Sequence, residues 1–195
     1  MAGAARRIGA ETSATRARIV EATVELIRDE GYAAASTRRV AARAGLKPSL
    51  VHYYFPTTDD LLLEVCRQGA ADSDRMIDSA LASDDPVRAL WRFFVDTSRT
   101  AMSLEFMALA NHRPPVREAM AQHSVAMRAR QVELLGHLLG DRMKALEGFD
   151  PAGLALILAG IGRCIVMEKS LGVEEGHDQA RAIVESWLDR LVPPA

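Results

Sequence analysis

The stretch Ser36-Thr-Arg-Arg-Val-Ala-Ala-Arg-Ala-Gly-Leu-Lys-Pro-Ser-Leu-Val-His-Tyr-Tyr-Phe55 decides the fold of this chain. Its apolar residues are spaced so that two short helices, at 36–44 and 48–54, can share one core with a sharp turn between them. Gly45 lies where the chain must leave the first helix, a position that commonly needs positive φ. Pro48 suits the first turn of the second helix, where its missing N–H costs little. The pattern predicts a helix-turn-helix.

Most side chains that this arrangement leaves pointing outward are hydrogen-bond donors. Arginine can bind guanine bidentately in the major groove, whereas lysine, serine, threonine and tyrosine chiefly contact phosphates. The second helix of a helix-turn-helix enters that groove. The segment therefore predicts a surface for double-stranded DNA, and the alternative is a solvated helical hairpin with incidental charge. The outward set is Thr37, Arg38, Arg39, Lys47, Ser49, His52 and Tyr53.

Charge is unevenly distributed along the chain, although its formal net value is only -2. Residues 1–58 carry nine basic and five acidic side chains, and the remainder carries fifteen basic and twenty-one acidic ones. Neutralising phosphates requires local rather than global positive charge, so this asymmetry favours a nucleic-acid-binding end on an acidic body. Chance fluctuation within a short window is the alternative.

The residues from about Thr15 to Val65 resemble the TetR family of regulators. A first helix containing Arg-Ile-Val-Glu-Ala-Thr-Val-Glu-Leu-Ile is followed by Gly31-Tyr32 and then by the helix-turn-helix. Tyr54-Phe55, a threonine and an acidic pair come next. The likeness covers about a quarter of the chain. It implies a DNA-binding head followed by a helical domain that dimerises and houses a small-molecule pocket.

Roles for individual residues follow from this resemblance. It implies that Arg38, Pro48, Ser49 and His52 face bases while Thr37, Lys47, Tyr53, Tyr54 and Thr58 approach phosphates. Three positions depart from the family pattern. Thr58 stands where lysine is usual, Lys47 replaces a serine or threonine cap, and His52 replaces the commoner tyrosine. The departures put one phosphate contact and any inherited base preference in doubt.

Helical periodicity continues to the end of the sequence, and nothing alternates with period two over the length of a strand. The prediction is an all-α fold of about nine helices. Residues 1–58 form the helix-turn-helix domain, of which 1–12 are a flexible arm, and 59–195 form the ligand-binding and dimerisation domain. The further helices are expected from a capping box at Thr57 to about 82, from Pro86 onward, and at about 103–111, 116–139, 151–171 and 178–191.

Aromatic and sulfur-bearing side chains concentrate between residues 90 and 127, where they can line an apolar pocket or simply form core. A small-molecule pocket itself is implied by the resemblance. We expect His123 or Arg163 to supply its polar anchor. The full set of candidate ligand-binding residues is Trp91, Phe94, Met102, Phe106, Met107, His123, Met127, Arg163, Cys164 and Met167.

The last two helices are candidates for a dimer interface. The segment 151–167 is apolar nearly all round, so both of its sides must be covered, and the final helix carries one apolar stripe. The resemblance implies that the two helices meet their symmetry mates in a four-helix interface, whereas a purely intrachain core is the alternative. The candidate interface residues are Ala155, Ala159, Gly162, Val166, Ile183, Val184, Trp187 and Leu191.

Several classes of function are disfavoured by the sequence. It has no secretory signal and no uncharged apolar stretch of roughly 18 residues, so we predict a cytoplasmic protein without a membrane partner. Cys66 and Cys164 are expected to be small buried side chains. No metal spacing, cofactor motif or nucleophile elbow is recognised, so no metal, cofactor or catalytic residue is predicted.

The leading functional hypothesis is a homodimeric repressor that binds a pseudo-palindromic operator and is released by a small, mostly apolar effector. An activator or a ligand-independent architectural protein could share the same DNA-binding head. A helical enzyme is the least favoured class.

Overall fold

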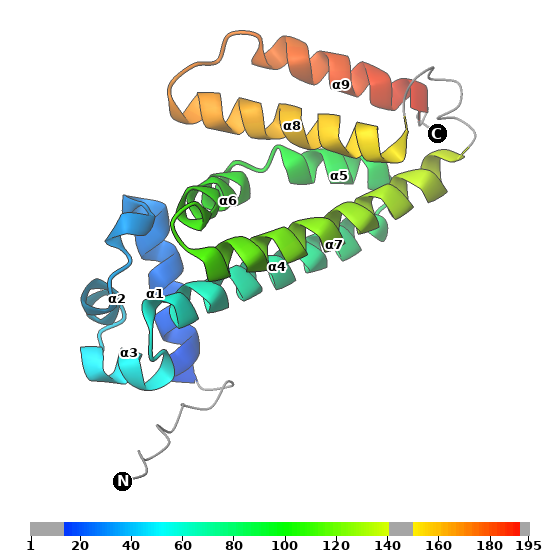
Figure 1. Cartoon of the computed structure of the whole chain (residues 1–195). Helices are drawn as coiled ribbons and strands as arrows, with labels where there is room; N and C mark the ends of the chain where they lie inside the picture. Colours follow the sequence, from blue (N-terminus) through cyan, green and yellow to red (C-terminus); the bar gives the residue numbers. More distant parts are fainter. Residues whose placement is uncertain (1–13, 141–149, 192–195) are drawn as a thin grey trace. The chain divides into compact units, whose positions relative to one another are not determined.

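The computed structural model describes residues 14–140 and 150–191, and within these ranges it contains α-helices, one short 3₁₀ helix and no strand (Figure 1). The predicted all-α class is confirmed. The arm predicted at 1–12 lies outside the described residues. In chain order the elements are α1 (Ala14–Glu30), η1 (Tyr32–Ala34), α2 (Thr37–Arg43), α3 (Pro48–Tyr54), α4 (Thr58–Leu81), α5 (Pro86–Phe94), α6 (Thr97–Ala110), α7 (Pro114–Leu139), α8 (Pro151–Ser170) and α9 (His177–Leu191).

The helices pack as two compact units. Unit 1 combines the residues up to Ala70 with Met102–Ala121, and unit 2 combines Ala71–Ala101 with the residues from Gln122 onward. The boundaries between the units therefore fall inside α4, α6 and α7. This grouping reflects packing, and the functional division at residue 58 stays a prediction.

Unit 1 encloses the apolar stripe of α1. Ile19, Leu26 and Ile27 are almost completely buried because they recur on one helical face that α2, α3 and α4 cover. Thr23 shares this buried face, and its hydroxyl donates to the Ile19 carbonyl at 2.7 Å, which removes the cost of an unpaired polar group. The two short helices α2 and α3 are thus held by packing on α1.

The predicted capping box at the start of α4 is confirmed. The Asp60 backbone N–H donates to the Thr57 hydroxyl at 3.1 Å, and the Thr57 backbone N–H donates to the Asp60 carboxylate at 2.9 Å. Two backbone donors that the helix leaves unpaired are satisfied reciprocally in this way. The box fixes where the chain leaves α3 and enters α4.

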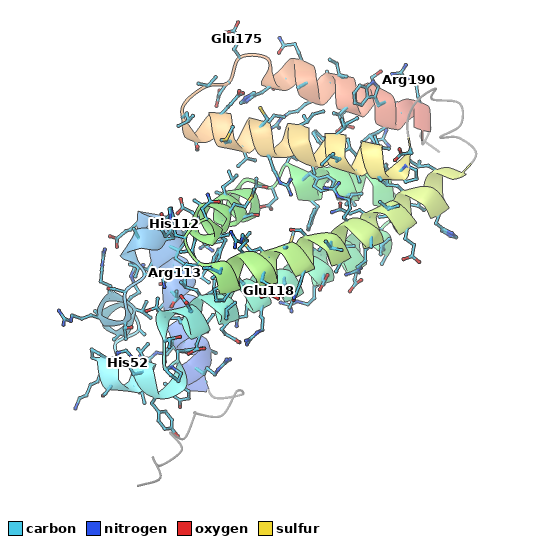
Figure 2. All side chains as sticks on the ribbon, viewed as in Figure 1. His52, His112, Arg113, Glu118, Glu175 and Arg190 are labelled. Carbon is cyan, nitrogen blue, oxygen red and sulfur yellow. The ribbon has the colours of Figure 1, made fainter. Side chains whose placement is uncertain are left out.

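The end of α6 and the start of α7 complete unit 1. The backbone N–H of Tyr32, in η1, donates to the Glu105 carboxylate of α6 at 3.0 Å. Arg113, which precedes α7, donates to the Asp59 carboxylate of α4 at 2.6 Å (Figure 2). These two polar contacts join segments that are more than fifty residues apart to the helix-turn-helix region.

Unit 2 is organised around the contact between α5 and α8. Each of these helices begins at an aspartate cap followed by proline. Asp85 accepts from the Arg88 backbone N–H at 3.0 Å, and Asp150 accepts from the Gly153 backbone N–H at 2.7 Å. Their shared core contains Leu90, Trp91, Phe94, Leu154, Ala155 and Leu158, and α9 adds Val184 and Leu188.

The helix α8 is long and apolar enough, by length and composition, to cross a membrane, and the described residues contain no other such helix. One helix of this kind is weak evidence for a membrane span. Ala155 and Leu158 are fully buried against the rest of unit 2, as expected for a core helix.

The start of α6 differs from its prediction. The helix predicted at about 103–111 begins at Thr97. Thr and Ser have weak helix propensity, so the local sequence gives little signal there. Packing decides the outcome, because Thr100 is buried and its hydroxyl donates to the Phe94 carbonyl at 3.4 Å.

Candidate nucleic-acid interface

The turn between α2 and α3 has the geometry that its sequence predicts. Gly45 adopts φ +63°, so the expectation of positive φ is confirmed. The N–H groups of Gly45 and Leu46 donate to the carbonyls of Ala42 and Ala41 at 3.1 and 2.8 Å, which is the Schellman pattern that ends a helix. The Arg18 guanidinium of α1 donates to the Ala44 carbonyl and so closes the same helix end from outside.

The start of α3 is simple and exposed. Lys47 precedes the helix in an extended conformation, with φ -81° and ψ 142°, and its side chain makes no capping hydrogen bond. Pro48 occupies the first turn, where no N–H is required. The Lys47 side chain therefore lies at the N-terminus of α3 but does not cap it. This agrees with the prediction that lysine replaces a capping serine or threonine at this position.

The outward side chains form an exposed ridge on α2, the turn and α3. Within it Arg38, Lys47, Pro48, Ser49, His52 and Tyr53 are exposed, and Thr37 is half-buried. Figure 2 labels His52 on α3. Exposure is the condition that a DNA-contacting surface must meet, and the role of each residue stays a prediction. We call this set the recognition ridge.

Arg39 and Arg43 differ from the other basic side chains of this region. Arg39 pairs with Glu30 of α1. Arg43 donates to the Asp29 carboxylate at 2.8 Å, and this hydrogen bond is the largest of the effects that raise the pKa of Arg43. These pairs hold α2 on α1. Arg39, which was predicted to be a DNA-binding donor, is already occupied by a carboxylate in the free chain.

Two predicted phosphate contacts lie at the edge of the ridge. Tyr54 and Thr58 are both half-buried. The Tyr54 ring packs edge-on against Tyr53, with 5.1 Å between ring centroids and an interplanar angle of 85°. Tyr53 is thereby supported in its exposed position, which reduces the entropy lost when it contacts a partner.

A partly buried ion pair that no local sequence pattern predicts supports the ridge from behind. Arg16 of α1 and Glu64 of α4 lie 2.6 Å apart, and each side chain is only 13% exposed. The same guanidinium lies 4.8 Å from the ring centroid of Phe55, at the end of α3. The hydrogen bond from Arg16 is the largest cause that lowers the pKa of Glu64. The pair joins α1, α3 and α4, and its members are too far apart in sequence for any local pattern to reveal them.

The buried members of the predicted ligand-binding set are divided between the cores of the two units. Trp91, Phe94 and Met127 belong to the core of unit 2, whereas Phe106 and Met102 belong to that of unit 1. His123 is half-buried. These positions match the alternative that the aromatic and sulfur-bearing cluster is core, and the pocket stays a prediction.

Four members of the predicted ligand set lie at the surface. Met107, Arg163, Cys164 and Met167 are exposed. The role of these four residues in ligand binding stays a prediction. The expectation that Cys164 is buried is wrong. The register of α8 turns Arg163, Cys164 and Met167 away from the core of unit 2.

The residues of the predicted dimer interface differ in their exposure, and their role stays a prediction. Ala155, Ala159, Gly162, Val166 and Val184 are buried within the single chain, so they have no surface left to lose to a second copy. Gly162 is enclosed most tightly, since a Cβ placed there would lie 2.5 Å from the Phe94 carbonyl oxygen.

The other members of that set lie differently. Ile183 is 51% exposed, and Trp187 is half-buried. Leu191 ends α9, and its side chain is outside the described part of the chain. The outer face of α8 carries other large apolar residues, Leu156 at 59% and Met167 at 47% exposed. Exposed apolar side chains are therefore present on α8 and α9, and among the described members of the predicted set only Ile183 is exposed.

The sequence and fold have counterparts among known proteins. Residues 19–65 match the model of the bacterial regulatory proteins of the tetR family. The HTH-type transcriptional regulator BetI 1 of Chromohalobacter salexigens is 32% identical over 109 residues, which are 51% of this chain and 54% of that protein. The chain thus spans about half the length of this curated relative.

Solved structures share the fold over most of the chain. A transcriptional regulator from Saccharomonospora viridis in complex with choline aligns with TM-score 0.69 and 20% identity, covering 89% of this chain and 95% of that one. The multidrug binding protein EbrR complexed with imidazole aligns with TM-score 0.62 and 24% identity, covering 94% and 98%. At these identities the likeness concerns the fold alone.

The geometry on its own defines a helix-turn-helix protein with an appended helical domain. The family match coincides with that helix-turn-helix, and the structural counterparts extend the likeness to the helices that follow. Residues 19–65 are thus similar to the DNA-binding region of the tetR family of bacterial regulatory proteins, and the chain as a whole shares the fold of solved transcriptional regulators.

Proposed function

We propose that this chain is a homodimeric repressor that binds a pseudo-palindromic operator through its recognition ridge and leaves it when a small effector binds. The single observation that carries the proposal is the exposure of Arg38, Ser49 and His52 on adjoining short helices ordered by the Gly45 turn. A protein of this kind acts where the chromosome lies, so we place it in the cytoplasm. It needs no catalytic residue.

The recognition ridge supplies both types of DNA contact. Arg38 can bind a guanine edge bidentately, and Lys47 can contact phosphate as a point charge. Within residues 14–140 and 150–191, neither Arg38 nor Lys47 forms an ion pair, in contrast to Arg39 and Arg43. Both are therefore available to contact the duplex, whereas Arg39 and Arg43 contact carboxylates of α1.

The experiment that tests DNA binding is selection of random duplex DNA on the full chain, followed by titration of the enriched sequence at several salt concentrations. We expect two related half-sites whose centres are about 34 Å, or a multiple of it, apart. Affinity should fall steeply with salt because phosphate contacts release counterions. Absence of any enriched sequence would overturn the proposal.

Arg38→Ala is expected to weaken binding to the enriched operator by about 1–3 kcal/mol and to relax the preference at one base pair of each half-site. Gel-shift titrations with operators mutated at single positions measure both effects. Arg92→Ala is the matched control, since Arg92 is an exposed arginine of unit 2. Equal affinities for wild type and Arg38→Ala would remove Arg38 from base recognition.

The dimer is proposed to form through the outer face of α8 together with α9. Leu156, Ile157 and Met167 are exposed on α8, and Ile183 is exposed on α9, which packs beside it (Figure 1). Large apolar residues exposed on one face mark interaction surfaces. A second copy that presents the same face would cover them symmetrically.

Leu156→Asp is expected to weaken dimerisation by more than about tenfold, because the interface would bury an unpaired carboxylate. Sedimentation velocity across a concentration series measures the monomer-dimer equilibrium. Val125→Asp is the control, since Val125 is 72% exposed on α7 and outside this face. A dimer as stable with Leu156→Asp as without it would place the interface elsewhere.

Effector release is supported by the family and by its structural counterparts. The regulator from Saccharomonospora viridis was solved with choline, and EbrR with imidazole. Both are small molecules, so a small-molecule effector is the natural proposal for this chain. A ligand that binds the DNA-free form more tightly than the DNA-bound form lowers operator affinity. The ratio of its two affinities sets the largest decrease that it can cause.

A further inference from the structure

Two polar side chains of α7 break the apolar interior of unit 2. Gln131 is only 3% exposed, and its Oε1 atom is fully buried without a hydrogen-bond partner among the described residues. The Nη1 atom of Arg128 is also buried and has no hydrogen-bond partner among the described residues. Unpaired buried polar atoms are costly, and a native protein keeps them when something outside the chain pairs with them.

The two side chains are neighbours. Residues at i and i+3 of a helix lie on one face, with about 5–6 Å between their Cβ atoms. The apolar residues Met127, Leu134 and Leu135 of the same helix belong to the unit 2 core. One guanidinium donor and one amide oxygen thus lie together beside an apolar surface, which is the composition of a small-molecule site.

The charge around this pair is positive. Burial and the nearby Arg163 guanidinium of α8 both lower the pKa of Arg128, and burial is the larger cause. The two guanidinium groups would repel a cation bound next to Arg128. An anion bound there would instead stabilise the charged form of Arg128. The neighbouring Arg130 differs, because its guanidinium contacts Asp74 at 2.7 Å and also pairs with Asp78.

We propose that Arg128 and Gln131 form the polar end of an effector site for a small organic carboxylate with an apolar body. The carboxylate accepts from Arg128 Nη1, and a hydroxyl or N–H of the same molecule donates to Gln131 Oε1. Charge-assisted hydrogen bonds of this kind are strong in a water-poor interior. The inference rests on the proposed function, because it names the chemistry of the effector that function requires.

The sequence contains a signal for this site. Gln131 falls between Met127 and Leu135 at helical spacing, where the pattern calls for an apolar residue. The polar anchors predicted from the sequence were His123 and Arg163 instead. Arg163 is exposed, and its part here is to raise the positive potential at Arg128.

The test is thermal denaturation and calorimetric titration of the full chain with benzoate, salicylate and octanoate at millimolar concentration. The neutral controls are benzamide, salicylamide and octanol, and choline is the cationic control. We expect at least one carboxylate to raise the Tm while its neutral analogue and choline do not. Salicylate should bind more tightly than benzoate, because only salicylate carries a donor for Gln131.

Variants assign the effect to residues. Arg128→Met should weaken carboxylate binding by about tenfold or more, and Gln131→Leu should remove the advantage of salicylate over benzoate. Arg130→Met is the matched control and should leave affinity within about twofold. Both test variants replace a side chain that has an unpaired buried polar atom by an apolar side chain, so the fold should be retained.

Three results would overturn the inference: no stabilisation by any of the three carboxylates, equal stabilisation by choline or the neutral analogues, or unchanged affinity in Arg128→Met. Variants that change only the Tm of the free chain, without any ligand dependence, would indicate an ordered water at the site and would also overturn it. Operator binding is measured on the same samples. Intact DNA binding with a negative carboxylate result rejects this inference alone, whereas loss of sequence-specific DNA binding rejects the proposed function.

Discussion

Gly162→Ala is expected to lower the free energy of unfolding by about 3 kcal/mol, which is the upper end of what overpacking a core costs. A Cβ at residue 162 would lie 2.5 Å from the oxygen and 2.8 Å from the carbon of the Phe94 carbonyl. Both atoms are backbone, so no flexible side chain can move aside. The methyl group therefore forces α8 away from the end of α5, at the centre of the unit 2 core.

Gly160→Ala is the matched control, two residues earlier in the same helix. A Cβ there meets no atom within 4 Å, and alanine is a better helix former than glycine by about 1 kcal/mol. We expect Gly160→Ala to be neutral or stabilising while Gly162→Ala lowers the Tm by several degrees in the same denaturation series. Gly69→Ala in α4 serves as a second control outside the proposed dimer face, since residue 69 also has open space. A Gly162→Ala Tm equal to that of wild type would disprove the close approach of α8 to α5.

The different surroundings of Gly160 and Gly162 could not be predicted from the sequence. Gly160 and Gly162 occupy the same apolar helix two residues apart, and nothing local distinguishes them. Their different surroundings follow from the register of α8 against α5, which depends on packing between segments more than sixty residues apart. The same register explains why Ala155 is buried in the chain while Leu156 is exposed.

The helix-turn-helix could be predicted because its determinants are local. Gly45 requires positive φ, Pro48 requires a helix start, and Thr57 with Asp60 forms a cap within four residues. Each of these preferences acts over a few bonds, so the sequence expresses it directly. The bounds of α2 and α3 accordingly lie within one residue of their prediction.

The support behind the recognition ridge could not be predicted in this way. Arg16 and Glu64 are forty-eight residues apart, and their pairing depends on how α1 and α4 pack. Arg38 and Arg39 are adjacent arginines that the sequence does not distinguish, yet only Arg39 pairs with the Glu30 carboxylate. Charge counts therefore identified the basic surface without distinguishing which arginines are left for DNA.

Gly45→Val is expected to lower the free energy of unfolding by about 2 kcal/mol and to reduce operator affinity as well. At φ +63° a side chain clashes with the following carbonyl, which costs roughly 1–2 kcal/mol, and a β-branched residue fits worst. The added Cβ also lies 3.3 Å from Arg18 Nη2, the group that closes the end of α2. Relief of the strain would change the angle between α2 and α3, and with it the distance between Arg38 and Ser49.

Gly45→Asn separates backbone strain from the simple presence of a side chain. Asparagine adopts the left-handed conformation far more readily than valine, so this variant should recover most of the stability and of the operator affinity. Thermal denaturation and gel-shift titration on wild type, Gly45→Asn and Gly45→Val should then rank the three in that order in both measurements. If Gly45→Val unfolded at a lower temperature but bound the operator like wild type, the angle between α2 and α3 would not govern recognition. Equal losses for asparagine and valine would assign the effect to contact with Arg18 rather than to φ.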